Sequence, residues 1–169
     1  IPHIGEFILV LGQGSIGLML TALLSRTGAC IVSADLSPLR RELSMNLGAS
    51  LSLDPYSGNF QRKCLELTEG RGFDLIFEVS GNPQALNLAF SVAAFEADII
   101  AGSWYGKGLV NLGTAFHRGR FHLRSSQVST LPSKLLGRWS KERRSKVVWK
   151  LLKEVNVKSL ISHRLPLEK

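Results

Sequence analysis

Three glycines with the spacing G-x-G-x-x-G stand directly between an apolar run and a helix-like stretch. The glycines belong to Gly12-Gln13-Gly14-Ser15-Ile16-Gly17, the apolar run covers 7–11, and the helix-like stretch covers 15–27. Asp35 closes a second apolar run over 29–32. A glycine-rich hexapeptide alone is weak evidence, but this one has the strand, the helix and the later acid that the motif requires. The pattern predicts a strand–turn–helix unit that binds a dinucleotide.

Each glycine has a physical role in such a unit. Gly12 permits the tight turn, Gly14 lets the backbone approach a pyrophosphate, and Gly17 lets the helix pack closely against the sheet. The N–H groups of the helix start, at Ser15 and Ile16, are expected to face the phosphates, because the helix dipole favours negative charge there. An S-adenosylmethionine methyltransferase also has a glycine-rich first turn and an acid after its second strand, but that ligand has no phosphate for the helix start. The spacing therefore favours a dinucleotide.

The first hundred residues alternate between short apolar runs and amphipathic stretches of helix length. This alternation indicates β-α-β units with a parallel sheet, and strands that are apolar on both faces indicate helices on both sides. We predict an α/β chain with a doubly wound, mostly parallel sheet in three layers α/β/α, the Rossmann fold. The predicted strands are 6–11, 29–34, 50–53, 73–79 and 97–102, and the predicted helices are 15–27, 38–47, 59–69 and 83–94.

The later part of the chain has less regular patterning and more glycine. We predict strands near 109–112 and 121–128, the second at a sheet edge, and a helix over 140–155. An exit strand is predicted over 160–165. With no internal repeat and no low-complexity tract, residues 1–169 are expected to form a single domain.

Helix boundaries carry their own signals. Ser37-Pro38 and Asn82-Pro83 each offer an N-cap residue followed by proline at the first helical position. Gly48 stands where a C-terminal cap is expected. These signals agree with the predicted helices that start near 38 and 83.

The net charge of +8 is unevenly distributed, with −4 over residues 1–100 and +12 over 101–169. A basic half can indicate nucleic-acid binding, but no motif for reading nucleic acid accompanies the charge. Many of the cations cluster around the predicted helix 140–155. We expect a solvated basic face, or a surface that meets an acidic domain of a longer chain, and no nucleic-acid partner. The buried face of that helix is predicted to comprise Val147, Val148, Leu151 and Leu152.

Hydrophobic residues make up 44% of the chain and charged residues 20%, as in soluble globular proteins. No apolar stretch reaches the roughly 18 residues that span a membrane, and no signal peptide is visible. Cys30 and Cys64 form no C-x-x-C pair and are expected to be thiols of a cytoplasmic protein. Because Ile1 is not a start methionine, we expect an excerpt of a longer chain.

The histidines show no spacing typical of metal ligands. His117 and His122 are five residues apart, which puts them on opposite faces of any continuous strand. His3 and His163 lie far from both, and neither cysteine has a partner at ligand spacing. We therefore expect surface histidines and no metal site in this chain.

Asp35 bears on the choice of cofactor. A carboxylate at the end of the second strand accepts hydrogen bonds from the adenosine ribose hydroxyls and repels the 2′-phosphate of NADP, which favours NAD. Arg40 is close enough in sequence to pair with a 2′-phosphate, so NADP stays open. A turn or N-cap acid is the plain structural alternative for Asp35.

Further contacts are expected where other strands end, because ligands of such sheets lie beyond the carboxyl ends of the strands. Ser80 and Gly81 follow the fourth predicted strand, and Ala101 and Ser103 lie at the end of the fifth. Ordinary turn chemistry is the alternative explanation for each of these residues.

With these residues in place, the chain resembles the cofactor domain of the medium-chain dehydrogenase/reductase superfamily, in its zinc-type alcohol and sorbitol dehydrogenase branch. The resemblance covers nearly the whole chain, and its motifs are specific in combination. The matching segments are Gly5–Gly17, Asp35–Arg40 with Leu47-Gly48-Ala49, Phe73–Gly81 (similar to "fDvvfe.sG") and Leu160–Leu167.

The resemblance implies hydride transfer between an alcohol or polyol and NAD. It implies that Gly12 to Gly17 bind the pyrophosphate, that Asp35 and Arg40 bind the adenosine ribose, and that other residues line the nicotinamide. The lining residues would be Ala101, Ser103 and either Ser125 or Ser126. In this family the catalytic zinc and the proton relay belong to a separate N-terminal domain. The chain is thus expected to bind cofactor, to supply no catalytic residue, and not to turn over alone.

Two other functions stay open: an NAD-binding module without chemistry, acting as a sensor or scaffold, and a zinc-free, NADP-dependent quinone or enoyl reductase of the same superfamily. A homo-oligomer through the edge strand near 121–128 is a further expectation. Trp104-Tyr105 could shape the substrate side of the nicotinamide, although packed loop aromatics are favoured. The basic stretch Phe116–Arg120 has no assigned role.

Overall fold

The computed structural model describes residues 2–155, 157–161 and 164–167. Contacts along the chain define two compact units, residues 1–126 and 127–169, which are described separately. That residues 1–169 form a single domain stays a prediction.

Unit 1–126 is built on a six-stranded sheet with the order β3-β2-β1-β4-β5-β6. Every neighbouring pair is parallel, which confirms the predicted sheet. The chain moves outward from β1 on one side and then crosses to β4 on the other, so the strand order reverses between β1 and β4. The strands are Phe7–Leu11 (β1), Cys30–Ala34 (β2), Leu51–Leu53 (β3), Phe73–Glu78 (β4), Ala93–Ala101 (β5) and His122–Ser125 (β6).

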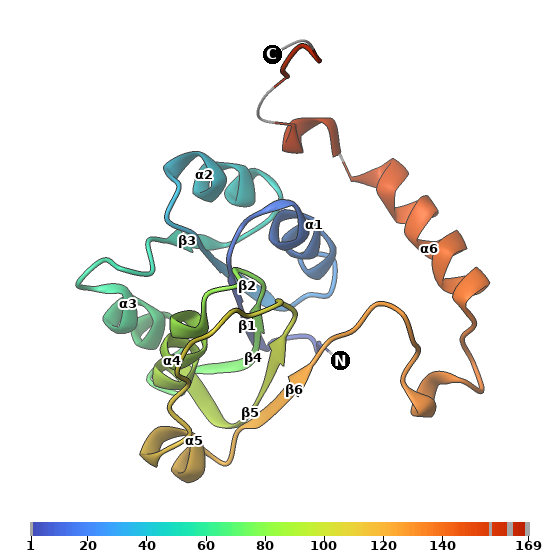
Figure 1. Cartoon of the computed structure of the whole chain (residues 1–169). Helices are drawn as coiled ribbons and strands as arrows, with labels where there is room; N and C mark the ends of the chain where they lie inside the picture. The colour runs from blue at the N-terminus through green and yellow to red at the C-terminus, as the bar shows by residue number, and fades with distance from the viewer. Residues whose placement is uncertain (1, 156, 162–163, 168–169) are drawn as a thin grey trace. The chain divides into compact units, whose positions relative to one another are not determined.

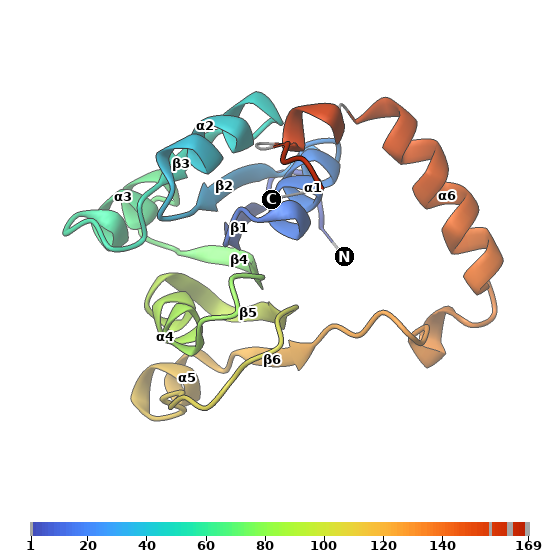
Figure 2. The ribbon, with the colours of Figure 1, turned by 45° about the horizontal axis from the view of Figure 1, so that its top comes forward.

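Helices cover both faces of this sheet, so that the unit has the three predicted layers (Figures 1 and 2). The helices α1 and α2 lie on one face, and α3, α4 and α5 lie on the other. The helices are Ser15–Leu24 (α1), Pro38–Asn46 (α2), Phe60–Leu67 (α3), Pro83–Val92 (α4) and Thr114–Gly119 (α5).

The apolar strands explain this two-sided cover, because successive side chains point to opposite faces. In β1, Ile8 and Val10 join the cluster beneath α1, whereas Leu9 and Leu11 join the larger cluster beneath α3 and α4. All four are buried, so neither face of this central strand is exposed to water. Such burial stabilises the unit by roughly 25 cal/mol per Å² of apolar surface removed from water.

Capping differs between the two helices that begin with proline. Asn82 Oδ1 accepts a hydrogen bond of 3.0 Å from the N–H of Gln84 at the start of α4. Ser37 is the N-cap residue of α2 as predicted, but its side chain makes no capping hydrogen bond within the described residues. Pro38 and Pro83 occupy the first helical positions, as predicted.

The region between β5 and β6 differs from the prediction. No strand forms over 109–112; the described backbone there is irregular and leads into the short helix α5, which was not predicted. Phe116 of α5 packs edge-on against Phe90, with ring centroids 5.4 Å apart. The strand predicted over 121–128 is confirmed only as the shorter β6, and His117 and His122 lie on different elements.

Unit 127–169 contains the 3-10 helices η1 (Ser133–Leu135) and η2 (Val157–Leu160) and the helix α6 (Lys141–Glu154), which confirms the predicted helix. Ser140 caps α6 by accepting a hydrogen bond from the N–H of Arg143 at 3.1 Å. The exit strand predicted over 160–165 is wrong for its described residues, which are 3-10 helical or irregular; residues 162–163 lie outside the described residues.

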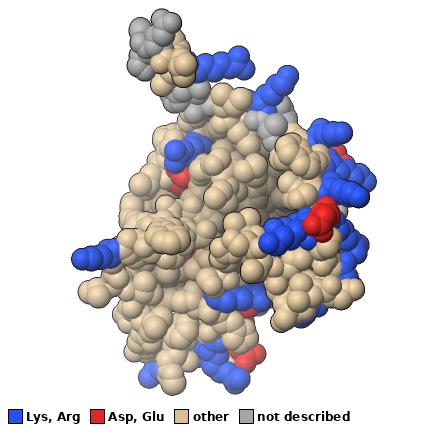
Figure 3. Space-filling view, turned by 45° about the vertical axis from the view of Figure 1, so that its right-hand side comes forward, with Lys and Arg blue, Asp and Glu red and all other residues tan. Residues whose placement is uncertain are grey.

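The predicted buried face of α6 is also wrong. Val147 and Val148 are exposed, Leu151 and Leu152 are half-buried, and no residue of the helix is fully buried. By sequence, eleven of the 21 Lys and Arg residues belong to residues 127–169. Figure 3 shows one face of the molecule with the Lys and Arg side chains in blue. Within the described residues, no helix is long and apolar enough to cross a bilayer.

Candidate nucleotide-binding site

The carboxyl ends of β1 and β4 lie side by side where the strand order reverses. In open α/β sheets, ligands bind in the crevice at this position, because the loops leaving neighbouring strands turn toward opposite faces. The turn from β1 into α1 and the loop from β4 into α4 flank this position. Both loops contain residues predicted from the sequence.

Two of the three turn glycines are required by the fold itself. Gly12 has φ +93°, and a Cβ there would lie 2.7 Å from Ser80 Cα. A Cβ at Gly17 would lie 1.9 Å from the carbonyl oxygen of Gly12. Side chains at either position would therefore force the turn, the helix and the neighbouring loop apart.

Gly14 differs from the other two glycines. Its φ of −71° suits any residue, and a Cβ built there would have no described atom outside the adjacent residues within 4 Å. Gly14 is the N-cap residue of α1, and within the described residues neither a side-chain cap nor an acid in the first turn occupies the helix start. Glycine at this position keeps open the space in front of the helix N–H groups, including those of Ser15 and Ile16. A helix start with free N–H groups is a position where an anionic group such as a phosphate can bind.

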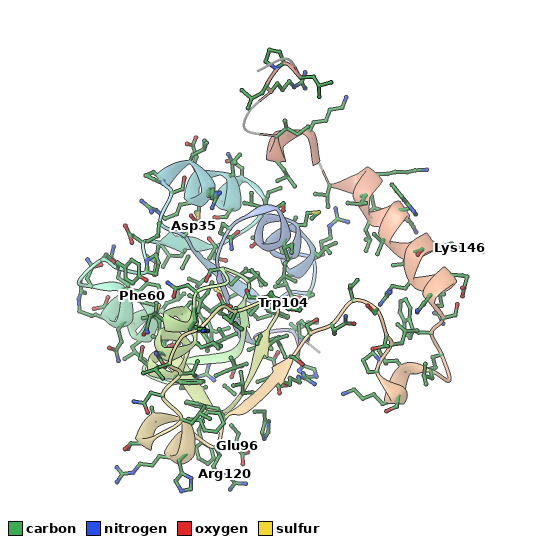
Figure 4. All side chains as sticks on the ribbon, in the orientation of Figure 1. Asp35, Phe60, Glu96, Trp104, Arg120 and Lys146 are labelled. Atoms are coloured by element: carbon green, nitrogen blue, oxygen red, sulfur yellow. The ribbon has the colours of Figure 1, made fainter. Side chains whose placement is uncertain are left out.

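Asp35 lies at the end of β2, beside the start of α2 (Figure 4). Its Oδ2 accepts a hydrogen bond from the N–H of Gln13 at 2.7 Å, and its Oδ1 accepts one from the N–H of Ser37 at 2.8 Å. The residue is only 8% exposed. Arg40 Nη1 lies 3.7 Å from Oδ2. The acid therefore joins the glycine turn to the start of α2, and it also has the turn role considered from the sequence.

Gln13, a residue that the sequence pattern did not single out, holds the turn from inside. It is fully buried; its Nε2 donates to the carbonyl oxygen of Val10 at 3.2 Å, and its Oε1 accepts from the hydroxyl of Thr21 at 3.0 Å. Its amide side chain therefore connects β1 to α1 beneath the turn. The position of Gln13 between two motif glycines did not predict these hydrogen bonds.

The predicted residues after β4, β5 and β6 also come together. Gly81 donates its N–H to Ser103 Oγ at 2.9 Å, which joins the loop after β4 to the loop after β5. Ala101 ends β5, opposite Ser125 of β6, and its carbonyl oxygen accepts from the N–H of Ser126 at 2.9 Å. These predicted contact residues thus lie at the carboxyl ends of β4, β5 and β6 or directly after them. Their roles toward a cofactor stay predictions.

Glu78 also lies at this edge of the sheet, although the sequence pattern did not single it out as a contact residue. It is fully buried at the end of β4, and its carboxylate accepts hydrogen bonds from the N–H of Ser80 at 2.7 Å, from the Ser80 hydroxyl and from the Tyr105 hydroxyl. Burial and the hydrogen bond to Glu78 raise the pKa of the Tyr105 phenol above its ordinary value. The sequence signal that could have identified Glu78 is the presence of an acidic residue within the apolar run 75–79.

The aromatic pair after β5 has divided roles. Tyr105 is half-buried and packs against the core, as favoured from the sequence. Trp104 is 97% exposed, so the expectation that it packs in the loop is wrong (Figure 4). Anchoring of Tyr105 to Glu78 leaves the neighbouring indole free in water.

Several charged groups away from this edge form surface ion pairs. Arg120 lies 2.9 Å from Glu96, and Arg124 lies 3.1 Å from Asp98, along the outer strands (Figure 4 labels the first pair). His122 is exposed, as are His3 and His117, whereas His163 lies outside the described residues. Within the described residues, no group of three or more His, Cys, Asp or Glu side chains could hold a metal ion.

Comparison with known proteins agrees with this geometry. A family model described as zinc-binding dehydrogenase matches residues 15–141. D-guloside 3-dehydrogenase from Escherichia coli (strain K12) is 29% identical over 154 residues, which cover 89% of this chain and 44% of the relative. L-threonine 3-dehydrogenase from Streptomyces coelicolor is 34% identical over 113 residues, which cover 66% of this chain and 30% of the relative.

The structure of 2R,3R-butanediol dehydrogenase from Bacillus subtilis has a TM-score of 0.72 and 25% identity, over 90% of this chain and 41% of that one. The chain spans less than half the length of each of these relatives. The match of the family model covers most of the chain, including the helix after the glycine turn and the five strands that follow. The chain therefore belongs to the zinc-binding dehydrogenase family, within the medium-chain dehydrogenase/reductase superfamily.

Proposed function

We propose that this chain is the nucleotide-binding part of an NAD-dependent dehydrogenase that acts on an alcohol or polyol. The observation that carries the proposal is Gly14, because it is the one turn glycine that neither its backbone angles nor the neighbouring described atoms require. Space kept open at the start of α1 has a direct use if a pyrophosphate lies there.

The residues of the crevice divide between the two halves of the cofactor. The glycine turn would hold the pyrophosphate, and Asp35 with Arg40 would hold the adenosine ribose on the β2 side. The nicotinamide half would then extend over β4 and β5, toward Ser80, Gly81, Ala101 and Ser103, with Ser125 at the end of β6. Bound NAD supplies a hydride acceptor for the alcohol carbon. The chain's part is to bind and orient it.

NAD is proposed over NADP on the basis of Asp35. Its carboxylate is held by two backbone N–H groups and retains lone pairs that could accept from ribose hydroxyls, whereas a 2′-phosphate would meet a negative charge. Arg40 lies within ion-pairing distance of the same carboxylate, so part of its charge is already matched. This arrangement favours the hydroxyl over the phosphate.

Calorimetric titration with NADH and with NADPH tests this choice. We expect tighter binding of NADH to the native chain and a shift toward NADPH in the Asp35→Ala variant, where Arg40 loses its carboxylate partner. The Arg40→Ala variant is the matched control and is expected to keep its preference for NADH. Equal affinities for the two nucleotides in the native chain would refute the choice of NAD.

The activity of the whole protein is proposed from its relatives. The names of the similar proteins describe dehydrogenases acting on a guloside, on threonine and on butanediol, all of which carry hydroxyl groups. We propose a small alcohol or polyol as substrate, zinc in a domain outside this chain, and a homo-oligomer formed through the edge strand β6. An upstream domain with a Cys/His zinc set would support these proposals, and a monomer by light scattering would contradict the last one.

A further inference from the structure

Glu78 is the most deeply buried charged side chain at the carboxyl edge of the sheet. Its exposed fraction is 0%, although carboxylates are rarely buried completely unless they are paired. Three donors point at its two oxygens: the N–H and the hydroxyl of Ser80 at Oε1, and the hydroxyl of Tyr105 at Oε2. All three groups donate hydrogen bonds, and the two carboxylate oxygens accept them.

These donors come from two different loops. Ser80 belongs to the loop between β4 and α4, and Tyr105 belongs to the segment that follows β5. The backbone of Glu78 adds a second connection, because its carbonyl oxygen accepts from the N–H of Gly102 at 2.8 Å. The hydrogen bond from Gly81 to Ser103 crosses between the same two loops. Glu78 is thus the point where the two loops meet.

The loop that Glu78 holds lies against the glycine turn. The ideal Cβ of Gly12 would lie only 2.7 Å from Ser80 Cα and Ser80 N, so the turn and this loop are in direct contact. A change in the position of Ser80 would therefore change the width of the crevice. Burial on the sheet side gives the carboxylate no water to replace a lost donor.

We propose that Glu78 is a positioning residue: its buried carboxylate joins the loop after β4 and the loop after β5 into one wall of the crevice, on the side where the nicotinamide half of the cofactor binds. The assignment of that side rests on the proposed function, since it follows from placing the adenosine ribose at Asp35. The joining of the two loops rests on the hydrogen bonds alone.

The Tyr105→Phe variant tests the wall with little change of shape, because it removes only the hydroxyl that donates to Glu78. Tyr56→Phe is the matched control: Tyr56 is exposed, and its hydroxyl accepts from the Asn82 side chain without touching Glu78. The probes are NADH, which has both halves, and ADP, which has only the adenosine and pyrophosphate groups. We expect Tyr105→Phe to raise the Kd for NADH at least fivefold and to leave the Kd for ADP within twofold.

If the bond between Tyr105 and Glu78 were only structural, Tyr105→Phe would lower the midpoint of unfolding, and it would change the Kd values for NADH and ADP together or leave both unchanged. Either pattern of Kd values would overturn the proposal. The Glu78→Gln variant adds a rescue test. Its side-chain oxygen can still accept from Ser80 and its amide can donate to the Tyr105 oxygen, so we expect its Kd for NADH within threefold of native. A loss as large as in Tyr105→Phe would contradict a positioning role.

Amide hydrogen exchange of the 169-residue chain without nucleotide separates this proposal from the proposed function. Tyr105→Phe is expected to speed exchange at least fivefold at Ser80, Gly81 and Gly102 together, while Tyr56→Phe leaves these amides unchanged. Faster exchange at Gly102 alone, or at none of the three, would show that Glu78 does not join the loops. If exchange changes as expected but the native chain binds neither NADH nor ADP, the proposed function is wrong, whereas the conclusion that Glu78 joins the two loops is retained.

Discussion

At the scale of single residues, the glycine turn separates what the fold needs from what a ligand needs. Gly12 and Gly17 lie where a Cβ would contact backbone atoms at 2.7 Å and 1.9 Å, whereas Gly14 borders open space in the described structure. A motif that reads as one pattern in the sequence therefore contains two kinds of position. Only one of the two kinds points to function.

The Gly17→Ala variant should show the structural kind. Its methyl group cannot avoid the Gly12 carbonyl oxygen unless α1 moves away from the turn, and such overpacking costs about 1–3 kcal/mol. We expect urea denaturation to show a loss in that range, with Gly14→Ala losing at most about 1 kcal/mol from its poorer N-cap residue. Equal losses in the two variants would contradict the distinction.

The buried thiol of Cys64 leads us to expect that the free energy of unfolding depends on pH. Burial raises the pKa of its thiol from 9.0 to about 12. Above pH 9 the unfolded chain loses this proton while the native chain keeps it, so the native state binds more protons and stability falls as pH rises. Below pH 9 both states keep the proton, and this thiol contributes no slope.

We expect the free energy of unfolding to fall between pH 9 and 12, with a slope from this thiol approaching about 1.4 kcal/mol per pH unit. The Tyr105 phenol adds to the decline above pH 10, because its pKa is also raised by burial and by its hydrogen bond to Glu78. Urea denaturation of native and Cys64→Ala chains at several pH values measures the slopes. An unchanged slope in the variant would show that this thiol is not the cause.

At the scale of elements, the two proline-started helices predict different costs for losing their N-cap side chains. Asn82 accepts a hydrogen bond from the N–H of Gln84, whereas the Ser37 side chain makes no capping bond within the described residues. The Asn82→Ala variant should lose about 1 kcal/mol of stability and Ser37→Ala less than about 0.5 kcal/mol. Thermal denaturation of both variants checks the difference, and the reverse order would contradict the capping assignment.

The elements up to β5 were predictable because each has an independent local signal. Apolar runs marked the strands, amphipathic stretches marked the helices, and Pro38 and Pro83 marked two helix starts. Predicted ends were one to three residues too long in most elements, as at α1, which stops at Leu24. Helix ends fray according to tertiary contacts, which the local pattern does not contain.

The elements after β5 were less predictable for a physical reason. The helix α5 has six residues between Gly113 and Arg120, too few for a period, and packing of Phe116 on Phe90 and Phe121 holds it. At the site, the glycine turn and Asp35 had sequence signals. The link from Glu78 to Tyr105 joins residues 27 positions apart and depends on the sheet register.

At the scale of the whole molecule, the two units have different character. Unit 1–126 carries ten Lys and Arg and ten Asp and Glu residues, a net charge of 0, whereas unit 127–169 carries eleven and three, a net charge of +8. The two apolar clusters lie within the first unit. The excess of basic residues found after residue 100 therefore belongs to unit 127–169, which contains neither apolar cluster.

Limited proteolysis with trypsin should reflect this division. The second unit has many exposed Lys and Arg residues and no fully buried residue in its long helix, so its backbone can open locally at low cost. We expect the first cuts after Lys134, Arg138 or residues of α6, and a resistant fragment that retains β1 to β6. Mass spectrometry identifies the fragments. First cuts within the sheet would contradict the assignment of the stable unit.

Calorimetric titration of NADH into the native chain and into the Gly14→Ala variant tests whether the glycine turn binds the pyrophosphate. We expect binding to the native chain and a Kd at least tenfold higher in the variant, about 1.4 kcal/mol, because a methyl group would occupy the space kept for the pyrophosphate. The variant should still unfold cooperatively, which excludes misfolding as the cause. Absence of binding to the native chain, or the same Kd in both, would contradict the claim.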